Sequence, residues 1–147
     1  VGCRPAYFAN QRIGRSLAHL AKRGIVMQGI GIDAVDIERF RTALERTPQL
    51  RNRLFTHDEL QSVSAKSDPT SSLAARFAVR EATMKALGVG LGAFDLHDVS
   101  VTKLTSGQPT LRIEGRAKQL ADARGITSWQ VSISHTDSVA IAVVAAE

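Results

Sequence analysis

The sequence is poor in the residues that mark several whole classes of protein. Cysteine occurs once, as Cys3, which excludes both an internal disulfide and a cysteine-based metal cluster. Aromatic residues make up 5% of the chain, with one Trp and one Tyr, so the stacking platforms of single-strand nucleic-acid binders are scarce. No apolar run approaches the roughly 20 residues that a membrane-spanning helix needs. We therefore expect no membrane partner and a cytoplasmic protein, since the cysteine usage suits a reducing compartment.

Acidic residues are absent from the first 32 positions of the chain, and this absence explains the net charge of +5. That stretch carries five basic residues: Arg4, Arg12, Arg15, Lys22 and Arg23. The remaining residues, 33–147, hold equal numbers of basic and acidic side chains and sum to zero. The high isoelectric point is therefore a property of the leader and does not indicate that the rest of the chain binds nucleic acid.

The basic leader, residues 1–26, is predicted to be an extension outside the folded domain, which we expect to span residues 27–147. Ile13, Leu17 and Leu20 follow a helical spacing with basic residues between them, which is compatible with a short amphipathic helix. Three interpretations stay open: an upstream segment preceding a true start at Met27, a solvated and disordered arm, or a targeting segment.

The rest of the chain predicts an α+β domain with a largely antiparallel sheet, because runs of alternating and helical periodicity follow one another. A strand is expected at 28–37, and a capping box of Thr56 and Glu59 predicts a helix start. The residues after Pro109 continue a β-hairpin whose turn is SGQP. The expected elements are a strand at 28–37, helices at 38–47, 56–65 and 73–87, strands at 98–104 and 110–115, a helix at 116–124, and strands at 128–134 and 138–146.

The third of these helices contains RFAVREATMKALG, residues 76–88, which places three cations around one carboxylate. Arg76, Arg80 and Lys85 surround Glu81 within an otherwise core-like helix. Taken alone, Glu81 and Lys85 are compatible with an ordinary surface ion pair one turn apart. A magnesium–phosphate site is the functional alternative, because Mg²⁺ takes one or two carboxylates plus phosphate oxygens.

A magnesium site would need a second carboxylate from elsewhere in the chain. Asp33 is the best candidate, since it lies at or near the end of the apolar strand that begins at residue 28. Asp36 is better placed to cap the following helix.

The paired segments GIGIDAVDIERF and RFAVREATMKALG resemble the holo-acyl-carrier-protein synthase family of phosphopantetheinyl transferases. The resemblance covers about residues 27–146 and rests on four motifs in the family's order. They comprise Gly31, Asp33 and Arg39; Phe77, Arg80, Glu81, Ala82, Lys85, Ala86 and Gly88; Gly107 and Pro109; and Ser132, Ser134, His135 and Thr136. One position departs from the family pattern, since Arg80 stands where Lys is usual. The positive charge is kept, but a planar guanidinium replaces a compact ammonium group.

The resemblance implies transfer of the phosphopantetheine arm of coenzyme A to a serine of apo-acyl carrier protein, in fatty acid biosynthesis. It implies that Asp33 and Glu81 hold Mg²⁺, with Mn²⁺ as a possible substitute, and that Lys85 acts with them in catalysis. The residues it assigns to coenzyme A are Arg76, Arg80, Lys85, Gly88, Ser134, His135 and Thr136. Either Glu81 or a metal-bound water is then the base for the serine. Without the resemblance, His135 would be an ordinary turn residue.

The resemblance also implies a homotrimer with active sites between subunits, in which a sheet face at 138–146 would be buried. It makes Arg39 the docking position for the acidic carrier protein, and Arg46, Arg51 and Arg53 extend the basic surface. The alternatives are a non-catalytic carrier-binding domain of the same fold, for which Arg80 is the only indication, a basic nucleic-acid-binding α+β domain, and a transferase domain cut from a larger synthase.

Overall fold

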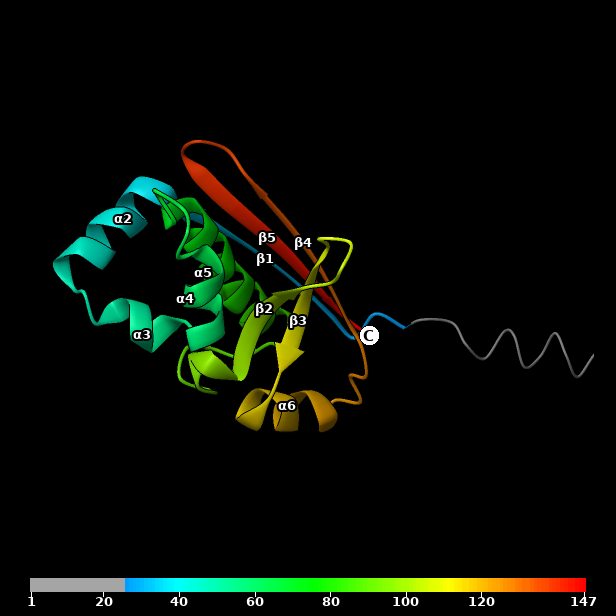
Figure 1. The fold of residues 1–147 in the computed structure, drawn as a ribbon. Coiled ribbons are helices and arrows are strands. Elements are labelled where there is room, and N and C mark those ends of the chain that lie inside the picture. The colour runs from blue at the N-terminus through cyan, green and yellow to red at the C-terminus, as the bar shows by residue number, and fades with distance from the viewer. Residues whose placement is uncertain (1–25) are drawn as a thin grey trace, which may run out of the picture.

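The computed structural model describes residues 26–147, so the predicted extension 1–26 lies outside the described residues except for Val26. Two antiparallel sheets and a set of helices make an α+β fold, as predicted (Figure 1). The larger sheet has the strand order β1-β5-β4, and the smaller one is the hairpin β2-β3. The strands are β1 (Gly29–Asp36), β2 (Val99–Lys103), β3 (Pro109–Ile113), β4 (Trp129–His135) and β5 (Val139–Ala146).

The helices follow the predicted order with two additions that the sequence analysis did not include. They are α2 (Ile37–Arg46), α3 (Leu50–Leu54), α4 (His57–Val63), α5 (Thr70–Ala86), the 3₁₀ helix η1 (Leu96–Asp98) and α6 (Gly115–Asp122). The additions are α3 and η1, which are too short to show a periodic pattern. No helix among residues 26–147 is long and apolar enough to cross a bilayer.

Local sequence signals explain where several helices begin and end. Asp36 caps α2 by accepting a hydrogen bond from the backbone N–H of Arg39 at 2.8 Å. The predicted capping box at the start of α4 is present, with Thr56 and Glu59 bonding each other reciprocally. Gly88 follows α5 with a positive φ of 63°, which ends the helix at little conformational cost.

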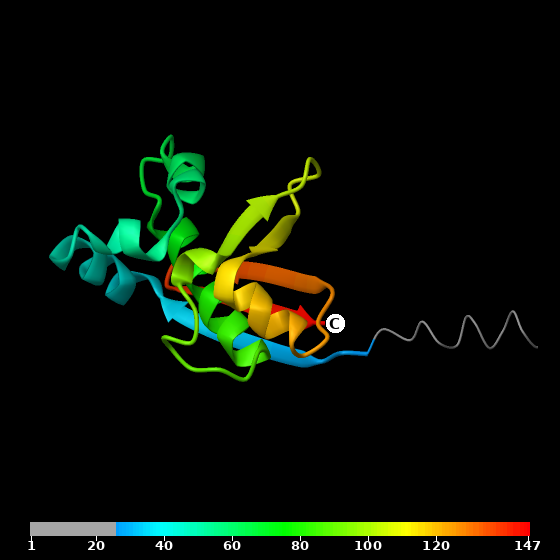
Figure 2. The same ribbon diagram turned by 90° about the horizontal axis from the view of Figure 1, so that it is seen from below.

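The central helix α5 lies along one face of the larger sheet and carries most of the core (Figures 1 and 2). Its Ala and Val side chains pack against β1, β5, the hairpin and α6 in one hydrophobic cluster. Its first turns pack with α2, α3 and α4 in a second cluster that contains Phe40 and Phe55. The helix is longer than predicted at its start, because Asp68 bonds the backbone N–H of Thr70 and so supports an earlier first turn.

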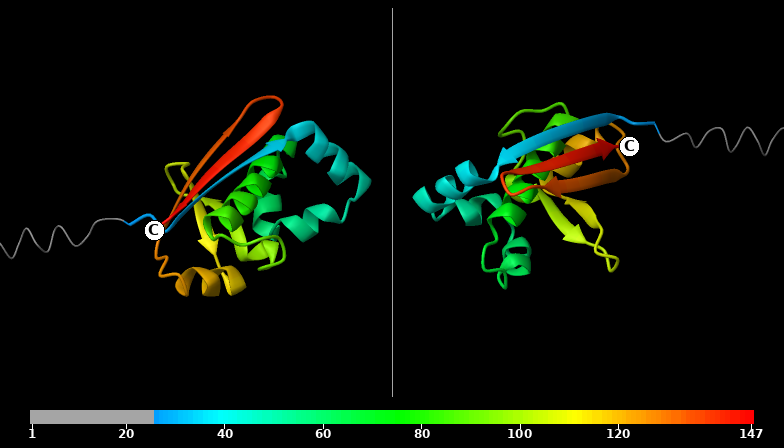
Figure 3. Two further views of the ribbon diagram at one scale, coloured as in Figure 1. Left: turned by 180° about the vertical axis from the view of Figure 1, so that it is seen from behind. Right: turned by 90° about the horizontal axis from the view of Figure 1, so that it is seen from above.

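The opposite face of the larger sheet has no covering helix in the described part of the chain (Figure 3). On this face Ile30 and Ile32 of β1 are 61% and 59% exposed, and Ile141 of β5 is 39% exposed. The register places Ile32 beside Val143, and Ile30 beside Ala145, so the face is continuously apolar across both strands.

Candidate active site

A lysine on α5 and an aspartate on β1 meet across the helix–sheet interface. The ammonium of Lys85 donates to Oδ1 of Asp33 at 2.8 Å and to the carbonyl of Ile32 at 2.9 Å. The surface ion pair considered for Glu81 and Lys85 is not among the salt bridges of residues 26–147, and Lys85 pairs with Asp33 instead. The strand therefore delivers the second carboxylate to the face of α5 that carries Glu81 and Lys85.

Glu81 is half-buried beside this pair, and its environment disfavours its charged form. Burial raises the pKa of Glu81, the nearby charge of Asp33 raises it further, and Lys85 lowers it in part. Two neighbouring carboxylates that repel each other in this way are stabilised when a cation binds between them. The electrostatics of the site therefore favour a bound cation at Asp33 and Glu81.

The donor set at Asp33 and Glu81 fits magnesium bound together with a phosphorylated ligand. Within residues 26–147, no group of three or more His, Cys, Asp or Glu side chains could hold a metal ion. Mg²⁺ commonly takes only one or two carboxylates from a protein and completes its octahedron with phosphate oxygens and waters. The pair thus suits Mg²⁺ on a diphosphate better than a closed metal site made of protein ligands alone.

Close packing between β1 and α5 sets the separation of these side chains. A Cβ atom on Gly31 would overlap the backbone carbonyl of Ala82, and one on Gly29 would overlap that of Ala86. The glycine-rich strand therefore lets the sheet approach the helix backbone directly. Asp33 lies two residues beyond Gly31 on the same face of the strand, which brings it level with Glu81.

Arg80 does not lie at this site, which corrects its predicted role in binding nucleotide phosphates. Its side chain is fully buried, and its guanidinium makes a two-pronged bond to Glu59, at 2.6 Å from Nη2 and 3.1 Å from Nη1. Its Nε donates to the carbonyl of Leu96 at 2.8 Å. The reason is the position of residue 80 on α5, which faces α4 and the hairpin instead of β1.

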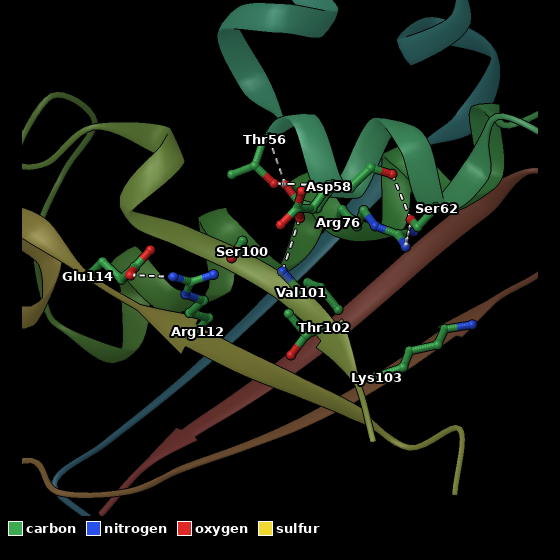
Figure 4. Close-up of a pocket in the computed structure, with 11 residues that line it drawn as sticks. Thr56, Asp58, Ser62, Arg76, Ser100, Val101, Thr102, Lys103, Arg112 and Glu114 are labelled. Carbon is green, nitrogen blue, oxygen red and sulfur yellow. Dashed lines mark hydrogen bonds and ion pairs between the residues drawn. The ribbon is translucent and has the colours of Figure 1, made fainter. Parts of the chain in front are cut away.

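Arg76, one turn before Arg80 on the same side of α5, lines a cavity of about 320 Å³ between α4 and the hairpin (Figure 4). It donates to the carbonyl of Ser72 and to the hydroxyl of Ser62, both at 3.0 Å. Its Nε is the buried side-chain polar atom without a partner among residues 26–147. Burial lowers the pKa of Arg76, which Glu59 offsets in part. The cavity is lined by Thr56, Asp58, Glu59, Ser62, Arg76, Ser100, Val101, Thr102, Lys103, Arg112 and Glu114.

Within one chain, this cavity and the carboxylate pair lie on different sides of α5. Residues 76 and 81 are separated by about 140° around a helix. Their contacts agree with this, since Arg76 bonds Ser62 of α4, whereas Lys85, one turn after Glu81, bonds Asp33 of β1. The predicted coenzyme A residues are thus not gathered into one site by a single chain.

Ser134, His135 and Thr136 of the fourth motif lie at the end of β4 and in the turn that follows it. Ser134 pairs with Ile141, and Asp33 pairs with Ala142, so the alternation of β-strands puts Ser134 and Asp33 on opposite faces of the sheet. His135 and Thr136 are exposed at the β4–β5 turn. The hydroxyl of Thr136 accepts from the backbone N–H of Val139 at 3.1 Å, so it also stabilises that turn.

The predicted docking arginines share one exposed end of the molecule, on α2 and α3. The side chains concerned are Arg39, Arg46, Arg51 and Arg53. Arg41, within the same basic stretch, is taken up by ion pairs to Glu38 and Asp68 and is not free to contact a partner. The basic segment therefore forms a surface of four unneutralised arginines in the described structure.

Sequence reasoning missed the central part played by Glu59 and the hairpin side chains of the cavity. Glu59 was assigned to the capping box alone, yet its carboxylate also binds Arg80 and the backbone N–H of Val101. An acid that is buried at a helix start carries no distinguishing pattern in the sequence. Lys103 and Arg112 belong to the predicted hairpin, but their position over Arg76 depends on how that hairpin packs.

Comparisons with known proteins agree with this fold. The profile of the 4'-phosphopantetheinyl transferase superfamily matches residues 29–144. The holo-[acyl-carrier-protein] synthase of Streptomyces griseus is 50% identical over 81% of this chain and 97% of its own length. That of Beutenbergia cavernae is 45% identical over 81% of this chain and 97% of its own.

Solved structures lead to the same family. The holo-[acyl-carrier-protein] synthase of Neisseria meningitidis superposes with a TM-score of 0.76 at 28% identity, over 83% of this chain and 99% of its own. The Helicobacter pylori enzyme in complex with coenzyme A gives a TM-score of 0.71 at 33% identity, over 80% of this chain and 99% of its own. The chain belongs to the 4'-phosphopantetheinyl transferase superfamily.

Proposed function

We propose that the protein is a holo-[acyl-carrier-protein] synthase, which transfers 4'-phosphopantetheine from coenzyme A to a serine of apo-acyl carrier protein. The observation that carries this proposal is the convergence of Asp33, Glu81 and Lys85, from two elements far apart in the sequence. The family membership and the Helicobacter pylori relative that binds coenzyme A support the choice of substrates.

In the proposed reaction, the serine oxygen attacks the phosphorus that bears the pantetheine arm. The bond from that phosphorus to the bridging oxygen breaks, and adenosine 3',5'-bisphosphate leaves with that oxygen. Such transfers depend mostly on positioning and on neutralising charge. Mg²⁺, held by Asp33 and Glu81, would supply charge neutralisation at the diphosphate.

The protein's own side chains then have distinct tasks. Lys85 is exposed enough to move from Asp33 toward a phosphate oxygen, where its ammonium would balance negative charge. Glu81 would accept the serine proton directly or through a water. Gly88 follows the end of α5, three residues after Lys85, and its backbone would be open to the ligand, since nothing lies within 4 Å of its missing Cβ.

We also propose that the protein acts as a homotrimer whose active sites lie between subunits. Two observations support this assembly. The uncovered face of the larger sheet is apolar, with Ile30, Ile32 and Ile141 exposed. In addition, the carboxylate pair and the cavity that contains Arg76 are separated within one chain. Such an assembly would bring residues of one subunit to the carboxylate pair of the next.

The carrier protein is proposed to dock on the exposed arginines of α2 and α3. Acyl carrier proteins are acidic, so Arg39, Arg46, Arg51 and Arg53 offer a complementary surface that would steer the encounter. The alternative of a non-catalytic carrier-binding domain depended on Arg80. That residue is buried in an ion pair with Glu59, so its identity no longer argues against catalysis.

The proposal is tested by the intact mass of apo-acyl carrier protein after incubation with this chain, coenzyme A and Mg²⁺. We expect the mass to increase by one phosphopantetheine group, and we expect a chelator to prevent the increase. If several apo-carrier proteins keep their mass while the chain is folded by circular dichroism, the proposed function is wrong.

A further inference from the structure

The largest fully buried side chain among residues 26–147 is a charged one, that of Arg80. It is 0% exposed, and its partner Glu59 is 2% exposed. Burying two charges is costly unless both are paired and their remaining donors and acceptors are satisfied. Arg80 directly precedes Glu81, the candidate metal ligand. We therefore ask what the buried pair contributes to the site.

Every polar side-chain atom of the Arg80–Glu59 pair has a hydrogen-bond partner. The guanidinium of Arg80 donates to both Glu59 oxygens, to the carbonyl of Leu96 at 2.8 Å and to the carbonyl of Arg76 at 3.3 Å. Its guanidinium carbon also lies 5.2 Å from the ring centre of Phe55. A lysine ammonium, with three donors on one nitrogen, cannot span the same set of acceptors.

Glu59 completes the network from the other side. Its carboxylate accepts from the backbone N–H of Thr56 at 3.0 Å and from the backbone N–H of Val101 at 3.0 Å. Burial alone would raise the pKa of Glu59, but the bonds and charge of Arg80 lower it overall, so the carboxylate stays ionised. One ion pair thus fastens α4, β2 and η1 to a single point on α5.

This point lies between the two halves of the proposed active site. Toward the start of α5, the Arg80 guanidinium bonds the carbonyl of Arg76, whose side chain faces the cavity. Glu59 and Val101 are themselves part of that cavity wall. On the other side, Glu81 follows Arg80 directly in the helix. A rotation or shift of α5 about this point would displace Arg76 and Glu81 together.

We infer that Arg80 is a positioning residue for the transfer reaction: through its two-pronged bond to Glu59 it fixes α5 against α4 and the hairpin, so that Arg76 and Glu81 are held in their binding orientations. This inference rests on the proposed function. In this role Arg80 does not contact the substrate. Glu59, which the motif does not contain, is as necessary as Arg80 for holding α5 in place.

The test compares Arg80→Met, Glu59→Gln and the double variant with the wild-type chain. Gln keeps an oxygen for only one of the backbone N–H groups of Thr56 and Val101, because these bond different oxygens of Glu59. The double variant leaves no unpaired buried charge, so it is the one most suited to fold. Three quantities are measured: the melting temperature, the dissociation constant for coenzyme A without metal by calorimetry, and kcat/KM for transfer.

If Arg80 and Glu59 position α5 together, the two single variants should lose both activity and coenzyme A affinity to a similar extent. Each should lower kcat/KM by about 10- to 100-fold, which is the range expected for small misplacements of catalytic groups. Each should also weaken coenzyme A binding without metal, because Arg76 moves. The double variant should lose no more than either single variant while its melting temperature recovers. Arg80→Lys should recover only part of the loss.

Three outcomes would overturn the inference. Loss in Arg80→Met with wild-type behaviour in Glu59→Gln would mean that Arg80 contacts substrate. Losses that multiply in the double variant would mean that the two residues act separately. A folded double variant with wild-type coenzyme A affinity and kcat/KM would show that the pair serves stability alone. If the wild-type chain itself neither binds nor transfers, the proposed function fails, and this inference fails with it.

Discussion

The ammonium of Lys85 lies 2.8 Å from the carboxylate of Asp33, across the interface between α5 and β1. The pair links a helix to a strand, and its two residues are 52 positions apart in the sequence. Because the Lys85 ammonium also bonds the carbonyl of Ile32, it holds the backbone in the middle of β1 as well as the side chain of Asp33, which the sequence had placed at or near the end of the strand. The relationship ties the proposed phosphate-binding group to the proposed metal ligand, so changes to either should affect both.

Glu81→Gln should abolish metal-dependent transfer while the fold is kept. The substitution removes one of two carboxylates for Mg²⁺, and we expect kcat to fall by roughly 10²–10³-fold or more, as for loss of other major electrostatic stabilisers. The assay is carrier-protein mass gain over time at saturating Mg²⁺. Asp122→Asn is the control, since it removes an exposed carboxylate of α6 that pairs with Lys118. Full activity in Glu81→Gln would rule out this metal site.

Gly31→Ala should destabilise the protein and impair the site together. The new methyl group would overlap the backbone carbonyl of Ala82, so β1 must move away from α5. We expect a loss of about 1–3 kcal/mol in the free energy of unfolding, measured by urea denaturation, as for other overpacked positions. Gly90→Ala is the matched control, because nothing lies within 4 Å of its Cβ position. Equal stability of the two variants would contradict the close-packing argument.

The stability of the fold should decrease in acid because of Glu59. Its pKa is lowered in the folded protein by Arg80, so its contribution is present above the unfolded-state pKa and is lost as pH falls through the folded-state value. Melting temperature measured from pH 7 down to about pH 3 should therefore fall more steeply in the wild type than in Glu59→Gln. Parallel curves for the two proteins would show that Glu59 does not contribute to acid sensitivity.

Ile32→Lys should disrupt the proposed trimer without unfolding the monomer. Ile32 is 59% exposed on the uncovered sheet face, so a charge costs little in one chain but much in a buried interface. Light scattering after size exclusion should report a trimer for the wild type and smaller species for the variant. Leu91→Lys is the control, since Leu91 is 78% exposed outside the sheet. A monomeric wild type would exclude the proposed assembly.

Arg39→Glu should weaken docking of the carrier protein more than it affects coenzyme A. Reversing one charge on a complementary surface should raise KM for the carrier protein by about tenfold at low salt, with a smaller effect at high salt. The KM for coenzyme A should stay close to the wild-type value. Arg116→Glu, on the exposed start of α6, serves as the control. Similar changes in both variants would indicate a general charge effect and not a docking site.

Much of the fold could be predicted because its signals are local. The Asp36 cap, the Thr56–Glu59 box and the glycine after α5 each mark a helix boundary within a few residues. All five strands were predicted, the first from its alternating isoleucines and the hairpin from its turn. The short helix α3 and the 3₁₀ helix η1 were missed because a single turn carries no period. The family motifs joined Asp33 to Glu81 and Lys85, which periodicity alone treats separately, and in the structure Lys85 bonds Asp33 and the charge of Asp33 raises the pKa of Glu81.

The role of Arg80 could not be predicted in the same way. Its residue type and its neighbours in the helix suggested a phosphate ligand, but its direction depends on what α5 packs against. Glu59, its partner, is 21 residues away in the sequence and looked like a helix cap. Nothing in a periodic pattern distinguishes a cation that faces solvent from one that faces a buried acid.

The sequence by itself determined the order and type of the main elements, the basic leader and the residues that carry the proposed chemistry, because these depend on local propensity and on residue type. Only the tertiary structure decided which of those residues share a site. Close packing of Gly31 on Ala82 brings Asp33 to Glu81, and burial directs Arg80 to Glu59. The direction of each side chain around α5 is set by long-range packing, whose energy comes from contacts between segments that are distant in the sequence.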